Sequence, residues 1–277
     1  MISIFIFYSP DRINALKATI SCLKEMEFYE KCQKTLIVDE KTDYLPEDFN
    51  LIRVPRINGK FNWSRMWDAG VYSAKFQTVL YLDSDRLLPK NFLSLIKNKI
   101  KPEVFLFTSL HFMMIRELSL EECKSFLSKP LEDMLQDNKY FGKLRFEVRS
   151  ENPLVGPGKN VMSGSTAFLK STYEKLGGVD PWYEGHGAFA DTDFHLHASR
   201  SGCQFIDLKL IEIHYFHEKI EKNHALSKKE LDKLGLHNYI YFCKKWNLPV
   251  VLAEDLANKI GIEKPREYVS DKWNSIG

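Results

Sequence analysis

Two aspartates, Asp83 and Asp85, follow the apolar run Val79–Leu82 and are separated by one serine. A short apolar run that ends at acidic residues is typical of a buried strand, so both carboxylates are expected at the strand's carboxyl end. Carboxylate oxygens are hard ligands that suit Mg²⁺ or Mn²⁺, and a divalent cation there can neutralise a diphosphate leaving group. A solvated turn explains the same residues equally well, so the pair alone does not separate the two interpretations.

A second acidic pair, Asp191 and Asp193, begins an expected helix that ends near Gly202. The positive end of a helix dipole favours a carboxylate at this position, where it can act as a general base. Asp191 taken alone is more simply explained as an N-cap, because aspartate is a preferred capping residue. The sequence therefore leaves a base and a cap open for Asp191.

Two histidines, His214 and His217, lie beyond the strand-like run Leu210–Ile213. Imidazole is a common ligand of divalent metals. A single histidine at this place would more often be structural, but two histidines downstream of two acidic pairs favour a metal site. With Asp83 and Asp85 they predict Mn²⁺ or Mg²⁺ as the cofactor.

Several common catalytic signatures are missing from the chain. The phosphate-binding patterns G-x-x-x-x-G-K-[ST] and G-x-G-x-x-G do not occur, and neither does the G-x-S-x-G elbow. His217-Glu218 is followed by Glu221 where H-E-x-x-H requires its second histidine. The phosphate-binding routes of nucleotide triphosphatases and dinucleotide folds are therefore absent.

The elements that must position these side chains alternate along the amino-terminal part of the chain. Apolar runs rich in Ile, Val and Phe predict buried strands of a mostly parallel sheet, and helical periodicity lies between them over 11–26 and 63–75. This alternation predicts an α/β, Rossmann-like fold, whose ligands bind at the carboxyl ends of the strands. Ser9, Asp39 and Asp83 fall at such ends. The predicted strands are Ile2–Tyr8, Thr35–Val38, Val79–Leu82 and Val104–Phe107.

The rest of the chain is less regular. A helix is expected over 117–138, starting near Ser119 with acidic residues in its first turn. The glycine- and proline-rich stretch 141–160 predicts a long loop, which in a compact domain often acts as a lid. Residues 161–217 return to α/β character, and 225–260 are expected to be helical and to lead into a tail.

Composition sets limits on class and partners. The chain has 277 residues, 44% of them hydrophobic and 27% charged, so it is expected to fold as a soluble protein, and its formal net charge of +2 points to no polyanionic partner. The five scattered cysteines predict a reducing compartment and no disulfide framework. No apolar stretch approaches the length of a signal peptide or membrane span, so a cytoplasmic location is expected.

Together these motifs resemble the GT-A fold glycosyltransferases. The segments Ile4–Arg12 and Ile37–Glu40 are similar to the opening strand, turn and nucleotide-binding aspartate of the family 2 enzymes. Residues 61–89 and 162–217 are more similar to the β-1,4-galactosyltransferases. The motifs that carry this likeness are Phe61-Asn62-Trp63-Ser64-Arg65, Ala69-Gly70, Asp83-Ser84-Asp85-Arg86-Leu87-Leu88-Pro89, Met162-Ser163-Gly164-Ser165, Gly178, Trp182, Asp191-Thr192-Asp193 and His214-Tyr215-Phe216-His217.

The resemblance implies a domain organisation. A GT-A domain would occupy 1–220, and a helical extension would follow over 221–277. Within the domain, 1–100 would form the nucleotide-binding half, 101–160 a helix and loop insertion, and 161–220 the acceptor and metal half.

The resemblance also implies roles for single residues. Asp191 would be the base that deprotonates the acceptor hydroxyl. Asp85, His217 and His214 would bind the metal, while Trp182 and Tyr183 would line the acceptor site. The nucleotide would lie against Ser9, Arg12, Asp39, Arg65 and Asp83, with Asp39 at the base and Asp83 at the ribose or metal.

The implied reaction is an inverting transfer from a nucleotide-diphosphate sugar, expected to be a UDP-sugar, to a hydroxyl of a glycan. Ala190 stands where the family has a glutamate, and 101–160 aligns with no part of the family, so sugar specificity does not carry over. Three alternatives remain: a retaining enzyme, a transferase for modified DNA bases, and a silent sugar- or nucleotide-binding module. The near-neutral charge disfavours a nucleic acid partner.

Overall fold

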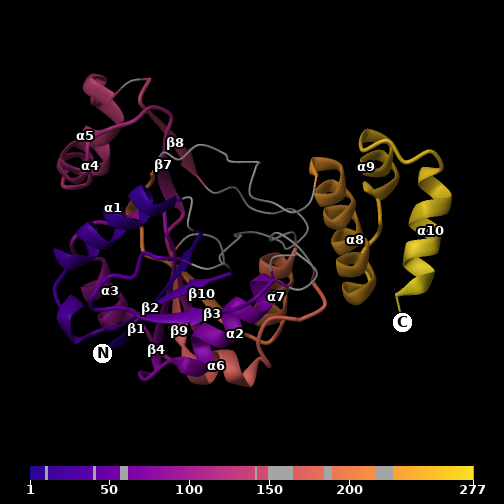
Figure 1. Ribbon diagram of the computed structural model, residues 1–277, viewed down its shortest axis with the longest axis horizontal. Coiled ribbons are helices and arrows are strands. Elements are labelled where there is room, and N and C mark those ends of the chain that lie inside the picture. Colours follow the sequence, from indigo (N-terminus) through magenta and orange to yellow (C-terminus); the bar gives the residue numbers. More distant parts are fainter. Residues whose placement is uncertain are drawn as a thin grey trace.

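The central feature of the computed structural model is a seven-stranded sheet of order β10-β6-β9-β4-β1-β2-β3 (Figure 1). The structure describes residues 1–9, 12–39, 42–56, 62–140, 142–148, 165–183, 189–215 and 227–276. All neighbouring strands run parallel except β9, which is antiparallel to β4 and β6. The strands are β1 Ile2–Tyr8, β2 Gln33–Val38, β3 Asn50–Arg53, β4 Thr78–Asp83, β6 Val104–Phe107, β9 Ser165–Leu169 and β10 Gln204–Asp207.

The sheet is apolar on both faces because helices cover both faces. Phe5 and Phe7 of β1 point into one hydrophobic cluster, and Ile4 and Ile6 point into the other. The first cluster is closed by α2, α6 and α7, and the second by α1 and α3. The predicted α/β fold with a mostly parallel sheet is confirmed. The helices are α1 Ile13–Lys24, α2 Trp63–Ser73, α3 Phe92–Lys99, α6 Lys170–Lys175 and α7 Ala190–Arg200.

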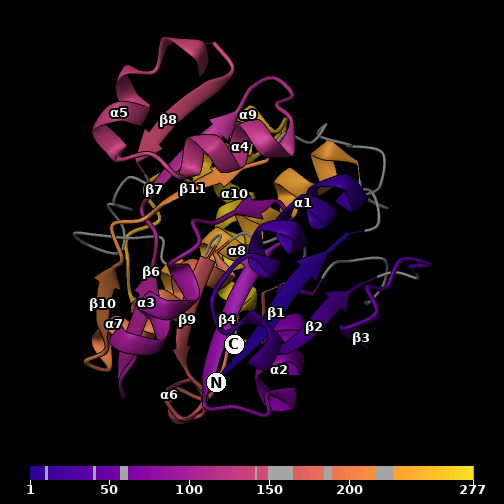
Figure 2. The same ribbon diagram turned by 90° about the vertical axis from the view of Figure 1, so that its left-hand side faces the viewer.

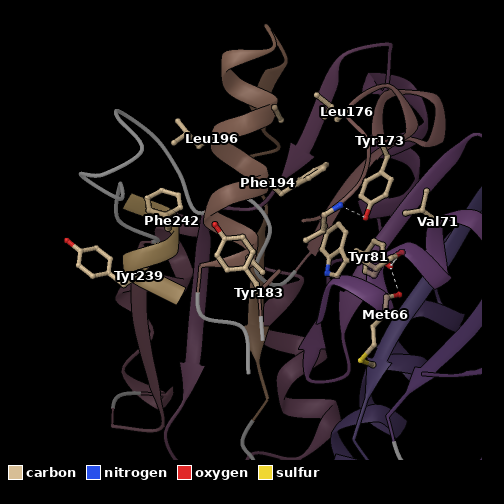
Figure 3. Close-up of a cluster of buried hydrophobic side chains, with 14 of the residues drawn as sticks. Met66, Val71, Tyr81, Tyr173, Leu176, Tyr183, Phe194, Leu196, Tyr239 and Phe242 are labelled. Atoms are coloured by element: carbon tan, nitrogen blue, oxygen red, sulfur yellow. Dashed lines mark hydrogen bonds between the residues drawn. The ribbon is translucent and has the colours of Figure 1, made fainter. Parts of the chain in front are cut away.

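A close contact fixes α2 on the sheet. Tyr81 of β4 donates its hydroxyl to the carbonyl of Trp67 at 2.6 Å and stacks its ring on the Trp67 indole. A Cβ on Gly70 would lie 2.5 Å from that hydroxyl, so only glycine lets the helix approach this closely. Figure 3 shows Tyr81 at this junction.

A second, four-stranded sheet of order β5-β11-β7-β8 stands beside the first and was not predicted (Figure 2). Its strands are β5 Arg86–Leu87, β7 Leu110–Met114, β8 Leu144–Val148 and β11 Ile211–His214. The helix expected over 117–138 is two helices, α4 Leu120–Leu127 and α5 Leu131–Gln136, because Pro130 lacks the amide needed to continue the first. Ser119 caps α4 in a capping box, as its position suggests. The loop expected over 141–160 contains strand β8; its remaining residues 149–160 lie outside the described part.

Three helices form the carboxyl-terminal region: α8 Lys228–Trp246, α9 Ala253–Lys259 and α10 Pro265–Ser275. The helix expected over 225–260 is interrupted after Trp246, where Asn247 takes a left-handed conformation before Pro249, and the expected tail is largely α10. Tyr239 and Phe242 of α8 join the cluster that contains Tyr183 and Phe194 (Figure 3).

The expected absence of disulfides holds, since all five cysteines are free. Among the residues that the structure describes, no helix is both long and apolar enough to cross a bilayer.

Candidate functional site

The acidic pair after β4 lies in a fixed turn. The amide of Ser84 donates to the carbonyl of Phe7 at 3.1 Å, and the hydroxyl of Thr19 donates to the carbonyl of Ser84 at 3.0 Å. The turn is thereby attached to both β1 and α1. Asp85 is only 1% exposed, which rules out the interpretation of a solvated turn for this residue.

Asp85 is surrounded by groups that are or can become cationic. Its Oδ2 accepts from Arg12 Nη1 at 2.7 Å and lies 3.3 Å from His214 Nε2, and its Oδ1 lies 3.4 Å from Arg86 Nε. A buried carboxylate requires such partners. Arg12, Asp83, Asp85, Arg86 and His214 are called the Asp85 cluster below. The cluster joins the start of α1, the β4–β5 turn and the end of β11.

Glu212 supports this cluster from the interior. It is 0% exposed and lies 3.2 Å from Arg86 Nη1, while Arg86 Nη2 lies 3.4 Å from Asp83. The hydroxyls of Thr108 and Ser165 both donate to Glu212 Oε2 at 2.8 Å. Burial lowers the pKa of Arg86, but the nearby carboxylates outweigh this effect and raise it. Arg86 is therefore held as a cation between a structural carboxylate and the acidic pair.

Glu212 and Arg86 were missed as functional candidates. The only sequence signal for Glu212 is a charged residue between two isoleucines in a buried strand. Such a residue needs a buried partner, and Arg86 is the partner that the second sheet supplies.

The predicted nucleotide-binding residues lie at the ends of adjacent parallel strands. Tyr8 of β1 pairs with Val38 of β2, and Phe7 pairs with Asp83 of β4. Ser9 and Asp39 follow these positions directly, so the register brings them to the same edge as Asp83. Parallel pairing therefore brings Ser9, Asp39 and Asp83 to one edge of the sheet.

The other two nucleotide candidates lie at the starts of helices. Arg12 comes from the turn before α1, where its amide donates to the carbonyl of Ser9 at 2.9 Å. Arg65 is exposed in the first turn of α2, which Asn62 caps. Asp39 has a partner that sequence reasoning missed, because Arg56 Nε donates to its Oδ2 at 2.8 Å.

The second acidic pair divides into two environments. The N-cap of α7 is Phe189, so Asp191 is the second residue of the helix and the N-cap interpretation is wrong. Asp191 is half-buried, and its Oδ1 accepts from the Thr192 amide at 2.8 Å. Asp193 is 1% exposed and accepts from Lys245 Nζ at 2.8 Å and Trp246 Nε1 at 2.6 Å. Asp193 thus attaches α8 to α7.

The predicted acceptor residues lie against α8. Trp182 is 40% exposed and stacks on Tyr241 with ring centroids 4.6 Å apart. Asp180 holds this pair in place, since it accepts from the Trp182 amide at 2.9 Å, from the Tyr241 hydroxyl at 2.8 Å and from Lys245 at 2.7 Å. Tyr183 is only 2% exposed and packs edge-on against Tyr241. Tyr183 therefore supports the site from the core, where the expectation was direct contact with an acceptor.

The donor types of the Asp85 cluster fit a divalent cation. Carboxylate oxygen and imidazole nitrogen suit Mn²⁺, and Asp85 Oδ2 and His214 Nε2 lie 3.3 Å apart. Within the described ranges no group of three or more His, Cys, Asp and Glu residues could hold a metal ion. His217 lies outside the described residues. Arg12 donates to Asp85 Oδ2, one of these ligand atoms. The Arg12 side chain is 31% exposed, so among the partners of Asp85 it is the one best able to move away from the carboxylate.

Comparisons with known proteins identify the fold. No family model matches the chain, and no curated protein does. The crystal structure of GalNAc-T7 with UDP, GalNAc and Mn²⁺ is similar at a TM-score of 0.60 and 13% identity, over 98% of this chain and 54% of that one. The mannosyltransferase PcManGT from Pyrobaculum calidifontis, in complex with GDP-Man and Mn²⁺, is similar at a TM-score of 0.52 and 11% identity, over 99% of this chain and 73% of that one.

At these identities the comparisons show the GT-A fold alone, and the chain spans about half of the first structure. The expected fold class is confirmed. The finer likeness to β-1,4-galactosyltransferase motifs stays a prediction.

Proposed function

We propose that this protein transfers a sugar from a nucleotide-diphosphate donor to an acceptor hydroxyl. One observation carries the proposal: Arg12, Asp83, Asp85 and His214 converge at the carboxyl ends of β1 and β4 within a GT-A fold. Ligands of open α/β sheets bind at this edge. The two similar structures hold UDP or GDP-Man together with Mn²⁺.

The nucleotide would lie along the ends of β1, β2 and β4. Asp39 would accept hydrogen bonds from the base, with Arg56 holding its carboxylate in orientation. Ser9 and Arg65 would flank the nucleotide, and Asp83 would accept from the ribose or bind the metal. A carboxylate suits the N–H donor of uracil, so we propose UDP as the nucleotide.

Asp85 and His214, together with His217, would hold Mn²⁺ or Mg²⁺. The cation would stabilise the negative charge that develops on the departing diphosphate. Arg12 then has a second role, since its guanidinium can leave Asp85 and pair with the donor phosphates. Arginine binds phosphate oxygens through paired N–H donors, which makes this exchange favourable.

Asp191 is the proposed base of an inverting transfer. The acceptor oxygen forms a bond to the anomeric carbon while the bond from that carbon to the diphosphate oxygen breaks, and Asp191 takes the hydroxyl proton. The positive end of the α7 dipole stabilises the ionised carboxylate that this role requires. Trp182 would offer its exposed indole face to the acceptor sugar.

We propose residues 1–220 as the catalytic unit and 221–277 as the helical extension that braces it. Contacts from Lys245 and Trp246 to Asp193, and from Tyr241 to Trp182, support a bracing role. The acceptor is proposed to be a glycan.

The test is nucleotide release from a set of UDP- and GDP-sugars, with and without Mn²⁺. We expect UDP release from one UDP-sugar, stopped by excess chelator and restored by Mn²⁺. The same donor should raise the melting temperature by mass action. Undiminished turnover in excess chelator would show that the reaction needs no metal. If no donor releases its nucleotide and none raises the melting temperature, the proposed transfer reaction is wrong.

A further inference from the structure

A cavity of about 430 Å³ lies beside the second sheet, and no residue of the Asp85 cluster lines it. Figures 1 and 2 both show α4 next to α1, and the cavity is lined by residues of α1, α4 and α5, by 88–91 after β5 and by 209–211 at the start of β11. In the β5–β11 ladder Arg86 pairs with His214 and Leu87 with Ile213. Leu88 and Ile211, which line the cavity, therefore lie at the end opposite Arg86 and His214. The volume of the cavity is within the roughly 300–1,000 Å³ typical of small-molecule sites.

The floor of the cavity is aliphatic. Leu88, Leu127, Met134 and Ile211 contribute to it, and each is less than 10% exposed. None of the lining residues is aromatic. Sugars and nucleotide bases are commonly held against flat aromatic faces, so this cavity suits neither a donor nor an acceptor of the proposed reaction. An aliphatic floor with an adaptable methionine suits a flexible hydrocarbon chain.

The rim of the cavity carries four lysines against one glutamate, Glu25. Glu25 is shared by Lys90 and Lys124, and Lys124 also lies 3.6 Å from Glu121, which does not line the cavity. Lys129 pairs with Asp137 and Lys209 pairs with Asp207, but neither aspartate lines the cavity.

These lysines remain able to bind an anion. Each ammonium has three N–H donors, and partly exposed ion pairs contribute little to stability. Lys90 and Lys209 are 75% and 76% exposed, so their ammonium groups can turn toward a ligand at little cost. A cationic ligand would instead meet four ammonium groups on the rim and a single lining carboxylate, Glu25.

We propose that this cavity binds a single-chain amphiphile with an anionic head. The hydrocarbon chain lies on Leu127 and Met134, and the head accepts from Lys90, Lys124 and Lys209. This binding needs neither a sugar donor nor a metal, so it can be tested independently of the proposed transfer reaction.

The experiment is calorimetric titration of the full chain with dodecyl phosphate below its micellar concentration. Dodecyltrimethylammonium provides the same chain with the opposite charge, and inorganic phosphate provides a head without a chain. We expect one dodecyl phosphate per chain, bound at least about tenfold more tightly than either comparison ligand. Equal affinity for the cationic and anionic amphiphiles would overturn the proposal, as would binding of several molecules per chain.

Two pairs of variants locate the site. Lys90→Gln with Lys209→Gln should weaken dodecyl phosphate binding by roughly tenfold, as loss of two charge contacts of about 0.7 kcal/mol each predicts. Lys101→Gln with Lys259→Gln removes the same charge from exposed residues outside the cavity and should leave the affinity unchanged. Ser128→Trp, at the C-cap of α4, fills the cavity from its exposed edge and should abolish binding, whereas Ser125→Trp, one turn earlier in α4, should not. Unaltered affinity in both cavity variants would show that the ligand binds elsewhere.

Discussion

The two acidic pairs have the same spacing but opposite organisation. After β4, both Asp83 and Asp85 face Arg86, and Asp85 also contacts Arg12 and His214. On α7, Asp191 is half-buried at the start of the helix, while Asp193 is turned inward to α8. Residues two apart on a helix face different directions. At the end of a strand, by contrast, a turn can bring two such residues to the same cation, as it brings Asp83 and Asp85 to Arg86.

The comparison shows how each half of the proposed site is supported. The donor half is held by strand ends and by Glu212 in the second sheet. The acceptor half is held by a helix from the carboxyl-terminal region, through Asp180, Asp193 and Lys245. Substitutions in the two pairs should therefore distinguish residues that act in the reaction from residues that stabilise the fold.

The largest expected effect is on Asp191. Asp191→Asn should lower transfer by roughly 10²- to 10⁴-fold, the usual contribution of a general base, because the amide cannot take a proton. Its neighbour Thr192 can still donate to the amide oxygen, so the melting temperature and UDP affinity should stay near those of the wild type. Asp191→Asn activity near the wild-type rate would show that Asp191 is not the base and would favour the retaining alternative.

The next effect is on stability, at Glu212. Glu212→Gln leaves Arg86 with one buried carboxylate fewer and should lower the free energy of unfolding by about 3–5 kcal/mol, as is typical when one partner of a buried ion pair is removed. Urea denaturation measures this change. The matched control is Glu254→Gln, an exposed residue of α9, which should change the free energy by less than about 0.5 kcal/mol. A loss at Glu212 no larger than at Glu254 would show that the cluster does not depend on it.

A smaller loss is expected at Asp193. Asp193→Asn weakens the bonds from Lys245 and Trp246 and should lower the free energy of unfolding by about 1–3 kcal/mol, while transfer per folded molecule changes less than about threefold. Activity and denaturation measured on the same preparation test both statements. A loss of transfer as large as that of Asp191→Asn would mean that both members of the pair act in catalysis.

The smallest effect is a pH dependence at Asp180. Burial raises the pKa of Asp180, but Lys245, the Trp182 amide and Tyr241 outweigh this effect and lower it below the ordinary value of 3.8. A carboxyl whose pKa is lowered in the folded state stabilises the protein above its unfolded pKa, and this stabilisation is lost as the pH falls through the folded value. Between neutral pH and pH 3, the melting temperature of Asp180→Asn should therefore fall less than that of the wild type. Equal falls would exclude Asp180 as a source of acid sensitivity.

The fold, and the residues that it brings to the carboxyl ends of β1, β2 and β4, could be largely predicted from the sequence, because both follow from short-range patterns. The runs Ile2–Tyr8 and Val104–Phe107 coincide with β1 and β6. Parallel pairing then brings the residues after such runs together without further information.

The second sheet and the acceptor half could not be predicted in the same way. β5 is a two-residue strand, too short for a periodic signal, and it pairs with β11 across more than a hundred residues. The contacts of Asp180 and Asp193 to Lys245 span 65 and 52 residues. The sequence pattern D-x-D also carries no sign of which carboxylate turns toward the interior. The substitutions at Asp191 and Asp193 address that question directly.

The measurement closest to the central claim is calorimetric titration of UDP, with Mn²⁺ and with chelator, into the wild type, Asp85→Asn and Asp193→Asn. Asp85 is buried, so each variant is first shown to be folded by its cooperative thermal transition. We predict that Mn²⁺ strengthens UDP binding by at least about tenfold in the wild type and in Asp193→Asn, and has no effect in Asp85→Asn. Equal UDP affinity with and without Mn²⁺ in the wild type, or a Mn²⁺ effect that survives in Asp85→Asn, would contradict the account.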